Sequence, residues 1–242
     1  MLLIVDGDVV AFRSAWNKNC FEDAVDRFEE MIEEIRERCF ATEVKIAIQG
    51  SNNFRTEFFP DYKNTPNRHK SKANNPYFMD MRNYLIEEGL AEPSDGMEAD
   101  DLVHIWAKEA RDAGIPFAVA SIDKDLLCIE GTHYLIHKNK FVYMNKDEAD
   151  IHYWTQILTG DGVDNIRGLK GIGPKKAEKI LEGHAIGERK QAVINAYYER
   201  CGDKWYEEIM HTATLIHILP TRDGHFKLED GDGPTNIEEE ES

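Results

Sequence analysis

The segment Gly96-Met97-Glu98-Ala99-Asp100-Asp101-Leu102 decides the fold, because it places three carboxylates at the start of a helix. The apolar residues that follow have the three-to-four-residue spacing of an amphipathic helix: Leu102, Val103, Trp106, Ala110 and Ala113. Asp95 and Glu98 fit a capping box, and acids at a helix start interact favourably with its dipole. Capping explains Glu98 but leaves Asp100 and Asp101 unexplained. Crowded carboxylates repel one another, so the segment predicts a bound divalent cation.

Strands and helices alternate around this segment. Short apolar runs predict strands over residues 2–5, 44–48 and 115–121, and helices are expected over 21–40 and 77–88. Such alternation predicts an α/β fold, a mostly parallel central sheet flanked by helices. A hairpin is expected from residues 134–136 and 141–143.

Acidic side chains should gather at one edge of this sheet. Asp6 and Asp123 follow strands and emerge at the carboxyl edge, and the acidic helix, antiparallel to the strand after it, begins there too. We therefore expect six acids to converge: Asp6, Glu98, Asp100, Asp101, Asp123 and Asp125. Turn formation is the alternative explanation for the last two. A ligand set made only of oxygens selects Mg²⁺ or Mn²⁺ over zinc.

Residues 52–75 are basic and aromatic. Arg55, Lys63, Arg68, Lys70 and Lys72 outnumber two acids, and four aromatic side chains lie among them: Phe54, Phe58, Phe59 and Tyr62. One interpretation is a solvated basic loop. We favour a mobile segment that binds phosphates through Lys and Arg and stacks bases on its aromatic rings.

The C-terminal part is expected to be helical, over residues 153–159, 188–201 and 203–218 and after Pro174. Gly171 and Gly173 allow close backbone approach, and N–H groups at the next helix start can bind phosphate. A plain helix–turn–helix would explain the glycines, but not five basic residues against one acid across residues 166–179. The expected DNA contacts here are Lys170, Gly171, Ile172, Gly173, Lys175 and Lys176.

Three regions follow from these patterns: an α/β core over residues 1–150, a helical lobe over 151–228, and an acidic tail over 229–242 that we expect to be disordered. The whole chain of 242 residues has a net charge of −17. The seven acids and no bases of the tail leave −10 on residues 1–228, so the clustering of basic residues matters more than the total.

Composition is that of a globular protein without membrane spans, with 41% hydrophobic and 31% charged residues. No signal peptide is apparent, because an acid follows the first five residues. Four scattered cysteines form no C-x-x-C pair, which predicts reduced thiols, a cytoplasmic location and no zinc site.

With these residues in place, the chain resembles the 5′-nuclease superfamily, which includes phage 5′ exonucleases, the 5′-nuclease domain of bacterial DNA polymerase I and flap endonucleases. The resemblance runs from Asp6 to about Leu181 and rests on motifs in the family's order. They are Ile4-Val5-Asp6-Gly7, Phe54-Arg55, Tyr62-Lys63, Glu98-Ala99-Asp100-Asp101, Asp123-Lys124-Asp125-Leu126, Gly160-Asp161, Asp164-Asn165 and Gly171-Ile172-Gly173.

The resemblance implies a PIN-like fold with a helix–three-turn–helix over residues 160–182. It implies a two-metal 5′-3′ exonuclease or flap endonuclease that acts on DNA with 5′ ends, flaps or nicks, with RNA–DNA hybrids left open. One ion would be held by Asp6, Glu98 and Asp100, and the other by Asp125, Asp161 and Asp164, with Asp101 and Asp123 beside them.

The resemblance further implies that Lys63, Arg55 and Arg68 contact the scissile phosphate, and that a K⁺ ion binds at the glycine turn. A monomeric, phage-type protein in the cytoplasm of a bacterial host is expected.

One departure concerns the end of the second strand. Most relatives carry an Asp there, and this chain has Gln49-Gly50-Ser51, with Asp8 as a substitute ligand. Two alternative functions stay open: a PIN-like ribonuclease, and a catalytically silent protein that binds DNA structures.

Overall fold

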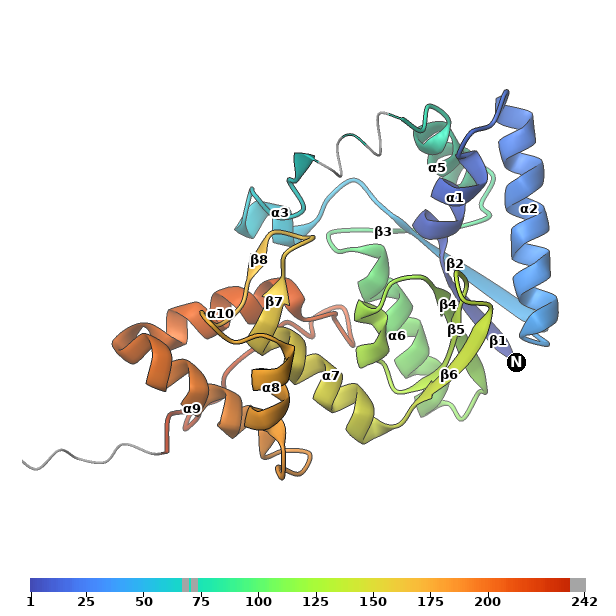
Figure 1. Cartoon of the computed structure of the whole chain (residues 1–242). Helices are drawn as coiled ribbons and strands as arrows, with labels where there is room; N and C mark the ends of the chain where they lie inside the picture. Colours follow the sequence, from blue (N-terminus) through green and yellow to red (C-terminus); the bar gives the residue numbers. More distant parts are fainter. Residues whose placement is uncertain (67–69, 71–73, 236–242) are drawn as a thin grey trace, which may run out of the picture. The chain divides into compact units, whose positions relative to one another are not determined.

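The computed structural model describes residues 1–66, 70 and 74–235, and these form two compact units (Figure 1). The first unit comprises Met1–Asn145 and Ile218–Gly224, and the second comprises Lys146–His217 and the chain from His225 onward. The boundary between the two units lies before Lys146, where a helix begins. The predicted boundary at residue 150 falls inside that helix. Residues 218–224 return to the first unit because Ile218 packs in its core and the Leu219 N–H donates to Asp101 Oδ1 at 2.8 Å.

The first unit is built on a six-stranded sheet in the order β3-β2-β1-β4-β5-β6. Its strands are β1 (Leu2–Asp6), β2 (Glu43–Gln49), β3 (Glu92–Ser94), β4 (Phe117–Ser121), β5 (Gly131–Leu135) and β6 (Lys140–Met144). Every neighbouring pair is parallel except β5 and β6, which form the predicted hairpin. The chain order reverses on either side of β1, so ligands are expected at its carboxyl end.

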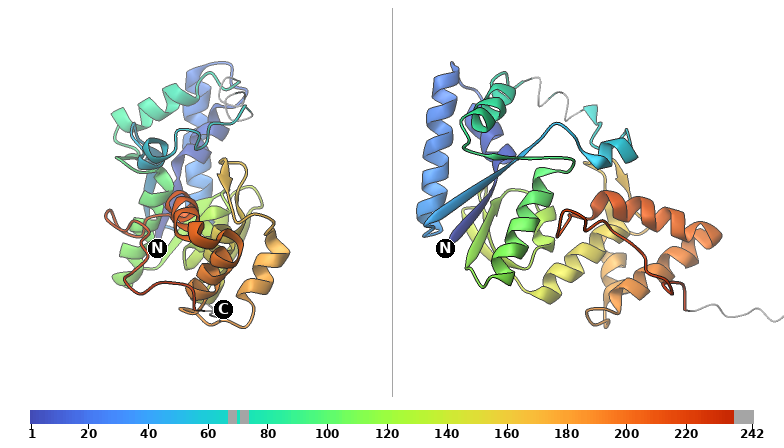
Figure 2. Two further views of the ribbon diagram at one scale, coloured as in Figure 1. Left: turned by 90° about the vertical axis from the view of Figure 1, so that its left-hand side faces the viewer. Right: turned by 180° about the vertical axis from the view of Figure 1, so that it is seen from behind.

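Alternating residues of β1 supply the two faces of the sheet. Leu3 and Val5 pack against α1 (Gly7–Ala15), α2 (Phe21–Arg38) and α5 (Phe78–Glu87), whereas Leu2 and Ile4 pack against α6 (Ala99–Asp112). Figure 2 shows α6 on the opposite side of the sheet from α2. The predicted α/β fold, a mostly parallel sheet flanked by helices, is confirmed.

Helix α1 and strand β3 were not predicted. Helix α1 begins directly after Asp6, and a Cβ on Gly7 would lie 2.6 Å from the Ala47 carbonyl oxygen. Glycine therefore lets α1 start close against β2. Strand β3 has only three residues and includes Pro93, which suits its place at the sheet edge.

The second unit is mainly helical. It contains α7 (Lys146–Thr159), α8 (Pro174–Leu181), α9 (Arg189–Cys201), the 3-10 turn η2 (Gly202–Lys204) and α10 (Trp205–Ile216). A two-stranded hairpin of β7 (Gly160–Asp161) and β8 (Ile166–Arg167), which was not predicted, joins α7 to the glycine turn before α8.

Residues 229–235 of the acidic tail contact the second unit through side-chain and backbone atoms. The Asp232 carboxylate pairs with Lys190 of α9, and the Gln191 amide donates to the Gly233 carbonyl oxygen at 2.7 Å. Residues 236–242 lie outside the described part of the chain. Among the described residues, no helix has the length and apolarity that a membrane crossing requires.

Candidate metal centre

A cavity of about 170 Å³ opens at the carboxyl ends of β1, β2 and β4. Acidic side chains from separate segments line it: Asp6, Asp8, Glu98, Asp100 and Asp123. Lys63 and Arg82 also line it. The predicted convergence of strand ends with the start of α6 is thus observed for Asp6, Glu98, Asp100 and Asp123. Asp101 and Asp125 do not line the cavity.

The carboxylates in this cavity are mutually destabilising. Asp6 is buried, and burial together with the charges of Asp8 and Asp123 raises its pKa to about 7, although the Ser121 hydroxyl donates to Asp6 Oδ2 at 2.7 Å. Burial and the charges of Asp6 and Asp123 raise the pKa of Asp100 well above its usual range.

These acids fit a divalent cation chemically, because a cation among them would relieve the repulsion. Across residues 1–66, 70 and 74–235, no three carboxylate, imidazole or thiol groups are already arranged as a ligand set.

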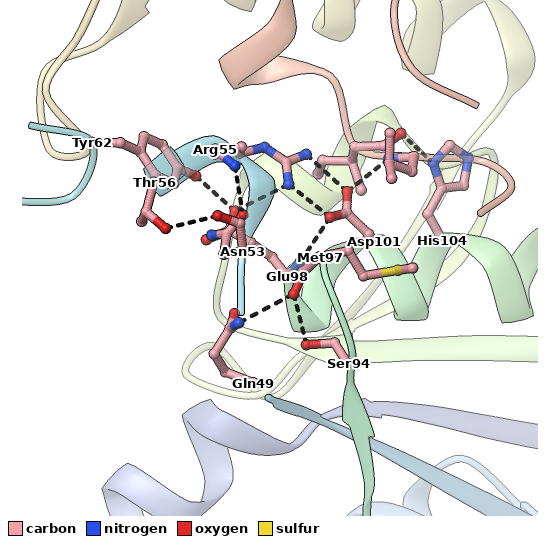
Figure 3. A network of polar contacts seen from close by, with 12 residues as sticks. Gln49, Asn53, Arg55, Thr56, Tyr62, Ser94, Met97, Glu98, Asp101 and His104 are labelled. Atoms are coloured by element: carbon pink, nitrogen blue, oxygen red, sulfur yellow. Dashed lines mark hydrogen bonds and ion pairs between the residues drawn. The ribbon is translucent and has the colours of Figure 1, made fainter. Parts of the chain in front are cut away.

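Glu98 contacts two side chains of the segment that precedes α5, and Figure 3 shows the contact with Tyr62. The Lys63 ammonium donates to Glu98 Oε1 and the Tyr62 hydroxyl to Oε2, each at 2.7 Å. Burial alone would raise the pKa of Glu98, but the charges of Lys63 and Arg55 lower it to about 2. Lys63 also has a positive φ of 56°, a strained conformation of the kind often found at functional sites.

Asp101 does not have the role predicted for it. Arg55 donates to both of its oxygens, at 2.7 Å and 2.8 Å, and backbone N–H groups of Glu98 and Leu219 fill the remaining positions at 2.9 Å and 2.8 Å. Asp101 is fully buried and forms the capping box of α6 with Glu98, so the predicted capping pair of Asp95 and Glu98 is wrong. A carboxylate with this many donors has no lone pair left for a metal ion.

The same contacts contradict the prediction that Arg55 binds the scissile phosphate. Its side chain is 1% exposed and its guanidinium is held by Asp101 within the network of Figure 3. Burial alone would lower the pKa of Arg55, but the hydrogen bond and charge of Asp101 raise it. Arg55 thus fixes α3 (Phe54–Phe58) to the start of α6.

Asp125, Asp161 and Asp164 are the remaining predicted ligands. Asp125 begins the 3-10 turn η1 (Asp125–Cys128), and its N–H donates to Asp123 Oδ1 at 2.8 Å. In the second unit, Asp161 is buried and its Oδ1 accepts from the N–H groups of Val163 and Asp164 at 2.7 Å and 3.4 Å. Asp161 and Asp164 stay predictions from the sequence.

At the end of β2, Gly50 lies close against the end of β3. A Cβ on Gly50 would lie 1.7 Å from the Ser94 carbonyl oxygen. The Gln49 N–H donates to Asp8 Oδ2 at 2.7 Å, and the Arg82 guanidinium contacts Asp8 Oδ1 at 3.1 Å. No sequence pattern pointed to Arg82, because an Arg on an amphipathic helix is usually solvated.

The predicted DNA-binding residues of the second unit surround an exposed glycine turn. Gly171 has a φ of 79°, which favours glycine, and Gly173 caps α8, which starts with Pro174. Lys170, Lys175 and Lys176 are exposed, and the Lys176 ammonium donates to the Gly171 carbonyl oxygen at 2.8 Å. The Ile172 side chain is buried.

Three predicted cations belong to the basic segment. Lys70 is exposed, and its carbonyl oxygen accepts from the Asn74 N–H at 3.2 Å. Arg68 and Lys72 lie outside the described residues.

Comparison with known proteins gives a consistent result. Residues 1–154 match the family described as 5′-3′ exonuclease, N-terminal resolvase-like domain. DNA polymerase I of Deinococcus radiodurans is 25% identical over 214 residues, 81% of this chain and 22% of the polymerase. The 5′-3′ exonuclease of Mycoplasma pneumoniae is 27% identical over 152 residues, 53% of this chain and 49% of that protein. This chain thus spans less than two thirds of either relative.

Solved structures share the fold. The T5 D15 protein, co-crystallised with metal ions, superposes with a TM-score of 0.65 at 18% identity, covering 89% of this chain and 85% of the other. A second structure of D15, described as a flap endonuclease of bacteriophage T5 in complex with DNA and metal ions, gives a TM-score of 0.61 at 15% identity over 89% and 98% of the two chains.

Proposed function

Since this chain belongs to the 5′-3′ exonuclease family, we propose that it is a divalent-metal-dependent 5′-3′ exonuclease and flap endonuclease that hydrolyses DNA phosphodiesters near 5′ ends. One observation carries the proposal: buried and partly buried carboxylates share a cavity with a lysine at the carboxyl edge of the sheet. Acids that repel one another in this way favour hard cations with oxygen ligands.

The residues proposed to hold the first ion are Asp6, Glu98, Asp100 and Asp123. When bound, a pair of Mg²⁺ or Mn²⁺ ions would supply an activated water and stabilise the leaving 3′ oxygen. The Ser121 hydroxyl donates to Asp6 and also accepts from the Asp123 N–H at 2.9 Å. Ser121 therefore connects the end of β1 to the chain that follows β4. Asp101 is left out of this set because its oxygens are occupied.

Lys63 is proposed to act on the phosphate. Its side chain lines the cavity, and its ammonium donates to Glu98 Oε1 at 2.7 Å. If the Lys63 ammonium exchanged its contact with Glu98 for one with a phosphate oxygen, it would stabilise the negative charge of the transition state. The ion pair with Glu98 thus keeps the lysine near the reacting group before substrate binds.

The glycine turn of the second unit is proposed to bind the duplex backbone. Its exposed lysines would neutralise phosphates, and its backbone and the start of α8 would hold a phosphate or a K⁺ ion. The complex of T5 D15 with DNA and metal ions supports this proposal by its likeness of fold. Action as a monomer, and on RNA–DNA hybrids as well as DNA, belongs to the same proposal.

A cleavage assay tests the function. Substrates with a 5′ flap, a nick, a blunt end and an RNA primer would be incubated with Mg²⁺, with Mn²⁺ and with EDTA, and the 5′ and 3′ ends of the products identified. We expect metal-dependent products with 5′ phosphates, and none from Asp100→Asn. Absence of cleavage by the wild type on every substrate would refute the proposal, and preference for single-stranded RNA would favour the ribonuclease.

A further inference from the structure

Arg82 brings a second cation into the carboxylate cavity. It lies on α5, its side chain is 13% exposed, and it lines the cavity with Lys63. Its Nε contacts Asp8 Oδ1 at 3.1 Å, and its Nη2 donates to the Gln49 carbonyl oxygen. Nη1 has a weak contact with the Met79 sulfur at 3.8 Å. A guanidinium has five N–H donors, so these contacts leave donors for a ligand in the cavity.

Asp8 and β2 fix the position of this guanidinium. Asp8 accepts from the Gln49 N–H through one oxygen and contacts Arg82 through the other, while the Gln49 carbonyl accepts from the same guanidinium. These three residues close a ring of contacts at the carboxyl end of β2. The Arg82 guanidinium lies 3.1 Å from Asp8 Oδ1, so a metal ion bound to this oxygen would be repelled by a neighbouring positive charge.

We propose that Arg82 binds a phosphate oxygen of the nucleic acid in this cavity, and that Asp8 holds Arg82 there instead of ligating a metal ion. The inference rests on the proposed function, since it takes a phosphodiester as the ligand. A polyanion that enters a cavity lined by five acids needs cations to meet it, and among the described lining residues Lys63 and Arg82 provide them. A guanidinium matches the geometry of two phosphate oxygens, which an ammonium does not.

The first experiment measures DNA binding without metal ions. A 5′-phosphorylated duplex with a short 5′ overhang is titrated by fluorescence anisotropy in EDTA at several salt concentrations. Arg82→Gln should weaken binding by at least about tenfold, as loss of a charge-assisted hydrogen bond predicts. The slope of log affinity against log salt should fall by about one, as loss of one phosphate contact predicts.

Arg111→Gln is the matched control. Arg111 lies in the last turn of α6, and its side chain contacts the Glu130 carbonyl oxygen at 3.2 Å beside a different cavity near Met1 and the start of β4. The substitution removes the same charge from the other end of the sheet, so affinity and salt slope should stay at the wild-type values. The affinity of Arg82→Lys for DNA should lie between those of the wild type and Arg82→Gln. If Arg82→Gln does not fold, Arg82→Lys still tests the proposal.

The second experiment separates the two roles open to Asp8. Asp8→Asn should bind Ca²⁺ with wild-type affinity and stoichiometry in calorimetry, and the double variant with Arg82→Gln should bind DNA no worse than Arg82→Gln alone. Weaker Ca²⁺ binding by Asp8→Asn would overturn the proposal, as would wild-type affinity and salt slope for Arg82→Gln. Failure of the proposed function would appear separately, as a wild type that binds DNA and cleaves no substrate.

Discussion

Glu98 and Asp101 are three residues apart at one helix start, and they have different roles. Asp101 accepts four hydrogen bonds and connects α6, Arg55 and Leu219, whereas Glu98 faces the cavity with Lys63 and Tyr62. Glu98 is the N-cap residue and has extended backbone, whereas Asp101 lies inside the first turn of α6. Whether a carboxylate can ligate a metal ion therefore depends on how many donors already surround it.

The buried pair of Arg55 and Asp101 predicts a large effect on stability. Arg55→Met keeps the volume of the side chain but leaves Asp101 buried without its cation, so the free energy of unfolding should fall by about 3–5 kcal/mol. Denaturant unfolding followed by circular dichroism measures this. Arg27→Met is the control, because Arg27 pairs with Glu30 and Glu34 on the surface of α2. Loss of these surface ion pairs should lower the free energy of unfolding by only about 0–1 kcal/mol. Equal losses in both variants would contradict the buried role.

Lys63 and Lys70 should differ in what they contribute. Lys63→Ala removes the cation in the cavity, so the single-turnover rate should fall by more than the affinity for DNA. Lys70→Ala removes an exposed charge, so it should weaken binding, flatten the salt dependence and leave the rate at saturating DNA unchanged. Binding isotherms and single-turnover rates for both variants make the comparison. If the two variants changed rate and affinity by the same factors, the special role of Lys63 would be contradicted.

At the scale of elements, β5 carries a buried histidine that links stability to pH. Burial lowers the pKa of His133, although its ring nitrogen lies 2.8 Å from the Ile129 carbonyl oxygen. The unfolded chain therefore binds the proton more readily than the folded one. His133 costs no stability above its unfolded pKa of about 6.5, and the fold loses stability as pH drops through that value.

His133→Gln should therefore lose less stability than the wild type between pH 8 and pH 5.5. Chemical unfolding at the two pH values gives the difference directly. His137→Gln serves as control, since His137 follows the same strand and is exposed. Identical pH dependence in wild type and His133→Gln would show that the proton is bound equally in the folded and unfolded states.

Two glycines in the connection from α7 to α8 should respond differently to alanine. Both have positive φ, 66° at Gly160 and 79° at Gly171, so each alanine costs about 1–2 kcal/mol from backbone strain. A Cβ on Gly160 would also lie 2.2 Å from the Gly168 nitrogen, whereas a Cβ on Gly171 meets no atom within 4 Å. Gly160→Ala should thus lower the unfolding temperature more than Gly171→Ala. The reverse order would contradict the packing of β7 against the chain after β8.

At the scale of the whole molecule, the proposed chemistry and the proposed duplex contacts belong to different units, so mutation should separate them. Asp123→Asn keeps the size of the side chain and removes a charge from the cavity, so cleavage should fall by orders of magnitude while duplex affinity stays level or rises. Gly173→Asp places an acid at the exposed start of α8, so affinity should drop while the rate at saturating DNA changes little.

A binding isotherm and a single-turnover rate for each variant test this separation. Lys204→Asp on η2 is a control for Gly173→Asp, because it introduces an acid into the second unit outside the glycine turn. Cleavage by Asp123→Asn at the wild-type rate would end the metal-site proposal. A rate defect in Gly173→Asp that persists at saturating DNA would end the assignment of the turn to binding.

Local sequence determined the elements and the edge of the sheet at which acids meet. Hydrophobic spacing is a local property, so it identified β1, β2, β4, α2, α5, α6 and the hairpin of β5 and β6. The carboxyl ends of parallel strands share an edge whatever the side chains are, so the sequence alone was enough to place Asp6, Glu98, Asp100 and Asp123 together.

Tertiary structure alone decided which charged groups face a ligand in the cavity. Arg55 and Asp101 are 46 residues apart and neutralise each other, and Arg82 reaches Asp8 across 74 residues of chain. No local pattern records such a pairing, because it depends on packing between distant segments. Among the described residues, the cations that line the cavity are therefore Lys63, which the sequence identified, and Arg82, which only the fold brings there.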